Sequence, residues 1–317
     1  MKSPAIDHQR GDAVSNHEQR TWRVRVPAST SNLGSGFDVL GLGLSMYLDL
    51  ELTTGTGDIE ITTTGEGEGA LPTDRSNLIA QLILEHAPQL ESQGFRVRTH
   101  SEIPLTRGFG SSASAIVGAI ALAQLATRGT FDRDEILRIS TAIEGHPDNV
   151  SGSICGGLTI SAVIGDQIHT QSIRLPESIR VVTITPDREL STSAARAALP
   201  ASYERKDAVF NLQRLGQLIS GLYENNIERI AAGLEDRLHQ SYRCGLMPAM
   251  AEAITRMKAV DGCVGAFVSG AGPAVAAFVT KNEDAVGAAG VAAFEADGIS
   301  AKYRVVDVDY EGIRERA

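Results

Sequence analysis

Alternating apolar and polar positions in the first hundred residues predict a set of β-strands. Apolar residues alternate with arginines over 22–26, and the same two-residue period recurs at 48–52, 59–61 and 95–97. Successive side chains of a strand point to opposite faces, so this period is typical of strands with one buried face. Pro27 cannot donate a backbone hydrogen bond, and we expect it to end the first strand.

Other segments of this half have the spacing of helices. Apolar residues at 78–83 follow Ser76, a residue type favoured as an N-cap. Asp132 and Glu135 form a capping-box pattern ahead of further apolar residues at helical spacing. The stretch 111–125 is apolar and rich in small residues, which indicates a helix buried on most sides.

The second half mixes both patterns without a regular alternation. Strand-like runs occur at 179–185, 264–268, 274–279 and 303–308, and helix-like runs near 207–220, 226–240 and 248–260. Because several strands look like hairpins, the order favours an α+β fold over a doubly wound parallel sheet. The length of 317 residues suits two domains, and the charged segment 165–178 is the best boundary. We predict a flexible extension over 1–20, a first domain over 21–170 and a second over 171–317.

Composition narrows the class of protein and its partners. A hydrophobic fraction of 42% with 21% charged residues fits a soluble globular chain, and the net charge of −10 argues against nucleic-acid and anionic-membrane partners. No apolar stretch approaches the ~20 residues of a membrane span, and the polar first twenty residues do not resemble a signal peptide. Cys155, Cys244 and Cys263 form no Cys-x-x-Cys pair and suggest free thiols in a reducing compartment. We therefore expect a cytoplasmic enzyme or binding protein.

A glycine- and serine-rich stretch joins a predicted strand to the small-residue helix. Gly108 and Gly110 permit close approach of the backbone to a ligand, and the unpaired N–H groups of a helix start favour a bound phosphate. Ser112 could offer an oxygen to Mg²⁺. The stretch is neither a Walker P-loop nor a dinucleotide fingerprint, and an ordinary loop that caps a helix is the alternative. The residues expected around a phosphate are Pro104, Leu105, Thr106, Arg107, Gly108, Phe109, Gly110, Ser111, Ser112, Ala113 and Ser114.

Two further stretches bring carboxylates together with other polar groups. In 27–38, Asn32 offers an amide and Asp38 an anion to an ammonium or hydroxyl group; a turn with Asx hydrogen bonds is the alternative. The stretch 144–149 reads Glu-Gly-His-Pro-Asp-Asn, and we expect its proline and glycines to stop any helix, so that its polar groups cluster on a loop.

The polar groups of that second stretch have assignable chemistry. Glu144 could hold Mg²⁺, and His146, Asp148 and Asn149 could contact a small polar substrate. The spacing of the histidine and aspartate is weak support for a structural zinc site. A polar surface loop is the alternative.

A glycine turn and two arginines complete the candidates. Ser269-Gly-Ala-Gly-Pro273 lies between two strand-like runs and could be a purely structural hairpin or a close approach to a ligand. Arg196 and Arg243 are either solvated charges or bidentate partners of a carboxylate.

Together these stretches resemble the GHMP kinase superfamily in order and spacing over about residues 22–310. Pro104–Ser114 looks like its phosphate loop and Ser269–Pro273 like its C-terminal glycine motif. The resemblance implies a two-domain α+β fold, with an N-terminal domain like ribosomal protein S5 domain 2 and a ferredoxin-like C-terminal domain. Within the superfamily, 27–43 and 144–157 are most similar to the members that phosphorylate L-homoserine with ATP, on the route to threonine.

The resemblance also implies a role for each candidate residue. It places ATP at the phosphate loop and Mg²⁺ at Ser112 and Glu144. It places Asp148 where some of these kinases have a catalytic aspartate, and it counts Arg196 among the catalytic groups. Asp38 would face the substrate ammonium and the two arginines its carboxylate. The implied substrate pocket consists of Asn32, Asp38, His146, Asn149, Arg196, Arg243 and Gly270.

The sequence departs from the superfamily pattern at two positions, and two alternative functions fit the same resemblance. Phe109 stands where Leu or Met is usual, and Ser241 stands where Pro is common before Tyr242. One rival is a kinase of the same superfamily acting on a mevalonate-like alcohol. The other is a non-catalytic metabolite-binding regulator on the same fold. A homodimer fits the resemblance but has no sequence signature here.

Overall fold

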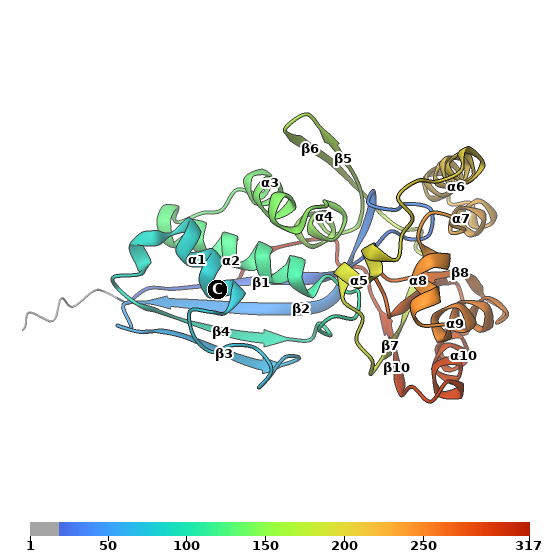
Figure 1. Ribbon diagram of the computed structural model, residues 1–317. Coiled ribbons are helices and arrows are strands. Elements are labelled where there is room, and N and C mark those ends of the chain that lie inside the picture. Colours follow the sequence, from blue (N-terminus) through green and yellow to red (C-terminus); the bar gives the residue numbers. More distant parts are fainter. Residues whose placement is uncertain (1–18) are drawn as a thin grey trace, which may run out of the picture.

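The protein consists of two domains that lie side by side, each with one β-sheet and its own helices (Figure 1). The structure is a computed structural model, and it describes residues 19–317. Apart from its last two residues, the expected extension over 1–20 lies outside the described residues. The α+β class expected from the sequence is confirmed, because most neighbouring strands are antiparallel while β3 and β4 are parallel.

The first sheet has the strand order β11-β1-β2-β4-β3, and the β5–β6 hairpin pairs with β2 through β5. Its strands are β1 (Thr21–Ser31), β2 (Leu40–Thr54), β3 (Ile59–Gly65), β4 (Phe95–Ser101), β5 (Leu158–Ile164), β6 (Gln167–Ile173) and β11 (Arg314–Glu315). The alternation along 48–52 turns one row of leucines inward, so that Leu48, Leu50 and Leu52 are buried.

Pro27 does not end β1, contrary to the sequence expectation. The strand continues to Ser31, and its register against β2 shifts between Pro27 and Ala28. A bulge tolerates a residue without an N–H group, so the proline bends the strand without stopping it. The continuation carries residues 28–31 into the region between the two domains.

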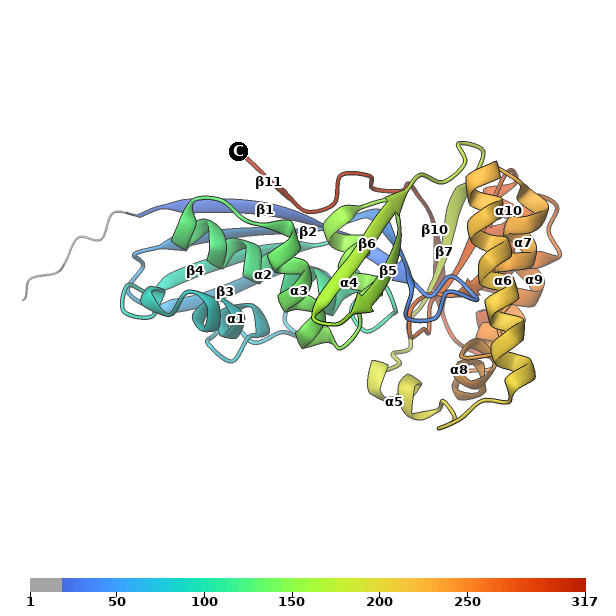
Figure 2. The same cartoon turned by 90° about the horizontal axis from the view of Figure 1, so that it is seen from above.

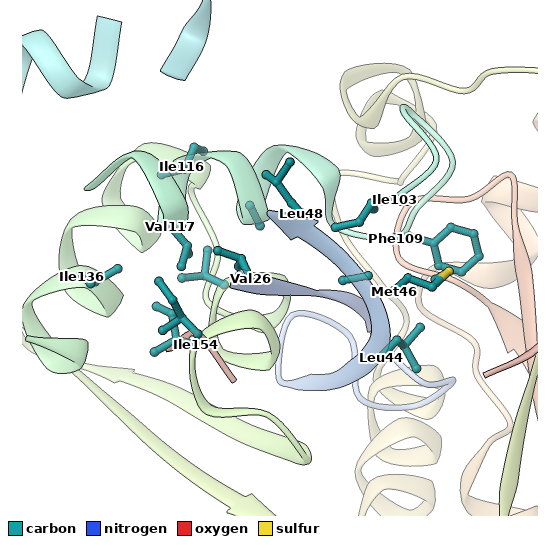
Figure 3. Packing of buried hydrophobic residues seen from close by; sticks show 14 of the residues in the cluster. Val26, Leu44, Met46, Leu48, Ile103, Phe109, Ile116, Val117, Ile136 and Ile154 are labelled. Atoms are coloured by element: carbon teal, nitrogen blue, oxygen red, sulfur yellow. The ribbon is translucent and has the colours of Figure 1, made fainter. Parts of the chain in front are cut away.

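Helices cover one face of this sheet, as the view from above shows (Figure 2). They are α1 (Leu78–His86), a short 3₁₀ turn (Pro88–Leu90), α2 (Ser111–Arg128), α3 (Arg133–Glu144) and α4 (Asp148–Cys155). Figure 3 shows Val26 of β1, Val117 of α2 and Ile154 of α4 in one apolar cluster. The small residues of α2 let it pack closely on the sheet, as expected of a helix buried on most sides.

Two helix starts differ in detail from the sequence prediction. The N-cap of α1 is Asn77, whose side chain accepts from the N–H of Ile79, and Ser76 instead bonds to Asp74. Asp132 caps α3 as expected, but the capping box is not reciprocal, because Glu135 pairs with Arg128.

The second sheet has the order β10-β7-β9-β8. Its strands are β7 (Arg180–Pro186), β8 (Cys263–Val268), β9 (Val275–Val279) and β10 (Ala301–Val306). Its helices are α5 (Thr192–Ala197), α6 (Arg205–Glu224), α7 (Ile227–Gly233), α8 (Gln240–Leu246), α9 (Ala249–Lys258) and α10 (Glu283–Ala296). Of these, α6, α7, α9 and α10 lie on the side of the sheet away from the first domain (Figure 2).

Only the first half of the helix-like run expected over 226–240 is helical, because α7 ends at Gly233 and α8 begins at Gln240. The chain stops being helical after α7, and Asp236 accepts hydrogen bonds from the N–H groups of Leu238, His239 and Gln240. A side chain that satisfies backbone donors in this way favours a new helix start over a continuous helix.

The chain crosses between the domains twice. The boundary expected at residue 170 falls within β6, and the C-terminal segment returns from β10 to the first domain. There β11 pairs with β1, and the N–H of Ile313 donates to the carbonyl of Ile154 at 3.2 Å. None of the helices in residues 19–317 has both the length and the apolar character needed to cross a bilayer.

Helices α6 and α7 touch almost backbone to backbone and support a loop that enters the interdomain region. A Cβ on Gly233 would lie 2.4 Å from the Cβ of Leu218. The carbonyl of Gly233 accepts a hydrogen bond from Ser35 at 2.6 Å. This glycine is therefore required by close packing.

We expect Gly233→Ala to destabilise the protein by about 1–3 kcal/mol, because the added methyl group forces the two helices apart. The matched control is Gly216→Ala in α6, where nothing lies within 4 Å of an added Cβ. There alanine's higher helix propensity should raise stability by up to about 1 kcal/mol. Denaturant unfolding measures both. A Gly233→Ala protein as stable as the Gly216→Ala protein would contradict the packing argument.

Candidate active site

A cavity of about 480 Å³ lies where the two domains meet. Its walls come from the end of β1, the start of α1, the loop before α2, the junction of α3 and α4, and three segments of the second domain. The glycine- and serine-rich stretch, the 144–149 stretch and both candidate arginines contribute to one cavity, although they lie far apart in the sequence.

The N-terminus of α2 opens into this cavity. Its N-cap is Gly110, in the left-handed conformation with φ 66°, and among the described residues no side chain caps the helix. Ser111 and Ser112 line the cavity. The first N–H groups of an 18-residue helix and the positive end of its dipole therefore face a space where an anion could bind.

The two loop glycines are required by contacts within the protein. A Cβ on Gly108 would lie 2.1 Å from the carbonyl oxygen of Ser269, and one on Gly110 would lie 2.3 Å from the hydroxyl of Ser29. The loop is therefore clamped between β1 and the glycine turn of the second domain. This packing holds the N-terminus of α2 in place.

The predicted phosphate-binding residues divide into two groups. Those that line the cavity are Leu105, Thr106, Arg107, Gly108, Gly110, Ser111 and Ser112. The others do not line it: Phe109 is buried near Met46 (Figure 3), and Ser114 donates to the carbonyl of Pro27. Pro104 and Ala113 also lie outside the lining.

Arg107 lines the cavity, but most donors of its guanidinium form hydrogen bonds within the protein. It donates to the carbonyls of Leu105, Pro186 and Asp187 and forms an ion pair with Glu189. This side chain therefore ties the loop to the end of β7.

Ser112 and Glu144 lie together beside the N-terminus of α2. The serine hydroxyl donates to the glutamate carboxylate at 3.1 Å, and both residues line the cavity. A hydroxyl and a carboxylate are hard oxygen donors of the kind that Mg²⁺ prefers, so the pair fits the ion that the sequence suggests.

The stretch 144–149 is not a simple loop, contrary to our expectation. Glu144 ends α3, Gly145 follows in the left-handed conformation, and Pro147 is the N-cap of α4. Asp148 and Asn149 thus form the first turn of a helix. A proline is well tolerated at a helix start, where its missing N–H costs nothing. The expectation of a loop considered only the ability of proline to stop a helix.

His146 and Asp148 form a buried hydrogen-bonded pair through Nδ1 and Oδ1. Burial alone would lower the pKa of His146, but the hydrogen bond and the negative charge of Asp148 outweigh it and raise the pKa above the ordinary value. Burial would raise the pKa of Asp148, yet the bonds from His146 and from the N–H of Asn149 lower it. The carboxylate is therefore held ionised.

Charges of both signs also line the cavity. Arg196 of α5 binds Asp38 with both terminal nitrogens, at 2.8 and 3.3 Å. Arg243 of α8 is only 2% exposed and donates to the carbonyl of Gly270 at 2.7 Å. Asn32 donates to the same carbonyl and accepts from the N–H of Asp38.

One wall of the cavity has no counterpart among the site residues predicted from the sequence. It consists of Leu71, Pro72, Leu78 and Ile79, next to Ser76 and Asn77. The residues of 78–83 gave a helix signal, but an apolar wall has no chemical signature by which a sequence can distinguish it from core. A possible metal-binding group consists of Asp38, His146 and Asp148, whose potential ligand atoms lie within 4.8 Å of one another. These atoms already have partners, because His146 bonds to Asp148 and Asp38 bonds to Arg196.

Comparison with known proteins identifies the family. Family models match residues 77–157 as the GHMP kinases N-terminal domain and residues 218–295 as the GHMP kinases C-terminal domain. The homoserine kinase of Desulfitobacterium hafniense is 37% identical over 297 residues, which cover 92% of this chain and 98% of that protein. The homoserine kinase of Nostoc punctiforme is 35% identical over 92% of this chain and 97% of its own length.

The fold agrees with these sequence relatives. The crystal structure of homoserine kinase from Cytophaga hutchinsonii superposes with a TM-score of 0.82 at 24% identity, covering 99% of this chain and all of that one (100%). The two-domain architecture expected from the resemblance is thereby confirmed. The chain belongs to the GHMP kinase family, and within it to the homoserine kinases.

Proposed function

We propose that this protein transfers the γ-phosphoryl group of ATP to the hydroxyl of L-homoserine and so forms O-phospho-L-homoserine for threonine synthesis. The observation that carries the proposal is one cavity that holds both a helix N-terminus and charges of both signs. A phosphate donor suits the helix N-terminus, and a zwitterionic amino acid suits the paired charges. The relatives named above support the same substrates.

ATP would lie with its phosphates at the start of α2. The free N–H groups and the hydroxyls of Ser111 and Ser112 suit phosphate oxygens. The apolar wall around Leu71 and Ile79 suits the flat base of the nucleotide. Ser112 and Glu144 would hold Mg²⁺, which when bound supplies positive charge against the phosphates.

L-Homoserine would bind between Asp38 and the two arginines. Its ammonium matches the carboxylate of Asp38, and its carboxylate matches the guanidinium groups of Arg196 and Arg243. The substrate would thus exchange the protein's Asp38–Arg196 ion pair for two ion pairs of its own. A mevalonate-like alcohol has no ammonium and would leave Asp38 without a new partner, so the paired charges favour an amino acid.

The reaction itself needs positioning more than covalent chemistry, since the transition state of phosphoryl transfer is largely dissociative. Asp148 is the candidate acceptor for the proton of the hydroxyl, although its lowered pKa makes it a weak base. Arg196 would add positive charge near the reacting groups. Asn32, His146, Asn149 and Gly270 would complete the substrate pocket. A cytoplasmic location and a homodimer remain predictions.

The first test is whether ADP release from MgATP depends on added L-homoserine. We expect turnover with L-homoserine to exceed that with mevalonate and other alcohols, and we expect a metal chelator to abolish it. A coupled ADP assay measures this. Preferred turnover of mevalonate would support the rival kinase, and ATP binding without turnover on any acceptor would support the non-catalytic regulator.

The role of Asp148 can be tested by replacing its carboxylate with an amide. If Asp148 accepts the proton, Asp148→Asn should lower kcat by a factor of roughly 10²–10⁴ with little change in KM. Steady-state kinetics with a check of the melting temperature measures this. A loss below tenfold would eliminate the base and leave Asp148 as the group that orients His146.

The placement of the substrate ammonium predicts a selective effect at Asp38. Asp38→Asn should raise KM for L-homoserine roughly tenfold or more, because a charge-assisted contact is lost, while KM for ATP stays nearly constant. The matched control is Asp166→Asn, an exposed carboxylate in the turn between β5 and β6. Equal losses for both substrates would count against this placement.

A further inference from the structure

His239 is the N-cap residue of α8 and contacts Arg243, which lines the cavity. It is fully buried, at 0% exposure, and does not line the cavity itself. Both of its ring nitrogens have partners: Nε2 lies 2.8 Å from the carbonyl oxygen of Gly34, and Nδ1 lies 3.2 Å from Nη1 of Arg243. One partner belongs to the first domain and the other to the second.

These two contacts define the state of the ring. A carbonyl oxygen only accepts, so Nε2 must carry the hydrogen. A guanidinium only donates, so Nδ1 must be without one. His239 is therefore neutral and in the Nε2–H tautomer. Burial and the positive charge of Arg243 both lower the pKa of His239, in agreement with the neutral ring.

The carboxylates near the His239 ring do not form hydrogen bonds with its nitrogens. Asp236 is the nearest carboxylate, but its Oδ2 is 3.7 Å from Nε2 and accepts from the N–H groups of His239 and Gln240. Asp38 acts on the ring only as a more distant charge. The hydrogen bonds of the imidazole are thus committed to Gly34 and Arg243.

Each partner is linked to a charged residue that lines the cavity: Gly34 to Asp38 through their common loop, and the second partner is the lining residue Arg243 itself. Gly34 lies in the loop between β1 and β2, which also carries Phe37 and Asp38. The ring of Phe37 stacks on His239 with centroids 5.2 Å apart. Arg243 also uses Nη1 to donate to Gly270, while its buried Nε has no partner among the described residues. Arg243 also lines the cavity, so its guanidinium can contact a ligand there.

We propose that His239 is a positioning residue that holds Arg243 and the Asp38 loop in one arrangement, so that the cation and the anion for the substrate keep a fixed separation. The proposal rests on the proposed function, because Arg243 and Asp38 are there the partners of the L-homoserine carboxylate and ammonium. A residue outside the cavity would thus control the geometry by which the site selects an amino acid.

Two substitutions separate the two contacts. In His239→Asn the amide oxygen can take the place of Nδ1 and keep the acceptor for Arg243, but the donor to Gly34 is lost. In His239→Gln the amide nitrogen can take the place of Nε2 and keep that donor, but the acceptor is lost. We expect each variant to raise KM for L-homoserine roughly tenfold, with KM for ATP within about twofold of the wild type.

A third substitution tests whether packing alone explains the residue. His239→Phe keeps a flat ring against Phe37 and removes both contacts, so it should raise KM for L-homoserine more than either amide variant. A KM within about twofold of the wild type would overturn the proposal. If this variant does not fold, the amide variants decide in the same way. His169→Gln, an exposed histidine on β6, is the control and should leave the kinetic constants unchanged.

The link to Arg243 is tested by a double substitution. In an Arg243→Met background, His239→Gln should change KM for L-homoserine by less than about twofold, because the contact it removes is already absent. A further tenfold rise would show that His239 acts independently of Arg243 and would overturn the proposal.

One measurement needs no substrate. In ¹⁵N-labelled protein, the ring signals that disappear in His239→Gln should have the pattern of a neutral Nε2–H imidazole at pH 7. An Nδ1–H or imidazolium pattern would overturn the proposal. Failure of the wild type to turn over L-homoserine would overturn the proposed function instead, and the two outcomes are thus distinguishable.

Discussion

The cavity depends on the backbone contact between the loop before α2 and the glycine turn of the second domain. Ser269 donates to the carbonyl of Gly108 at 2.8 Å, and the N–H of Ala274 donates to the carbonyl of Arg107 at 3.2 Å. The N–H of Gly270 in turn donates to the carbonyl of Ser31, at the end of β1. Three segments from two domains interlock here, and a side chain on Gly108 would separate them. The orientation of the α2 N-terminus relative to the arginines follows from this contact.

Local charge at the site differs from the charge of the whole chain. The net charge of −10 points away from anionic partners, yet Arg196, Arg243 and a helix N-terminus face one cavity. Burial lowers the pKa of Arg243 below its ordinary value, and the nearby positive charge of Arg196 lowers it further. An anionic ligand would relieve this repulsion.

The amino-acid sequence was enough to predict most of the strands, the buried helix α2 and the residues that converge on the cavity. It was misleading where one residue type has two uses. Pro27 lies at a bulge inside a strand and Pro147 at the start of a helix, whereas a proline in either pattern predicts a stop. The apolar wall of the cavity and the partners of His239 could not be predicted, because they depend on contacts between segments that are far apart in the chain.

The return of the C-terminal segment to the first sheet has a consequence for synthesis. β11 pairs with β1 at Val24 and Arg25, so this strand is completed by a segment that is made much later. Ribosomes deliver the N-terminal end first, and domains generally fold as they emerge. In this protein the outer edge of β1 has no strand partner until residues 314–315 have left the ribosome. The first domain is thus begun before the second domain and completed after it.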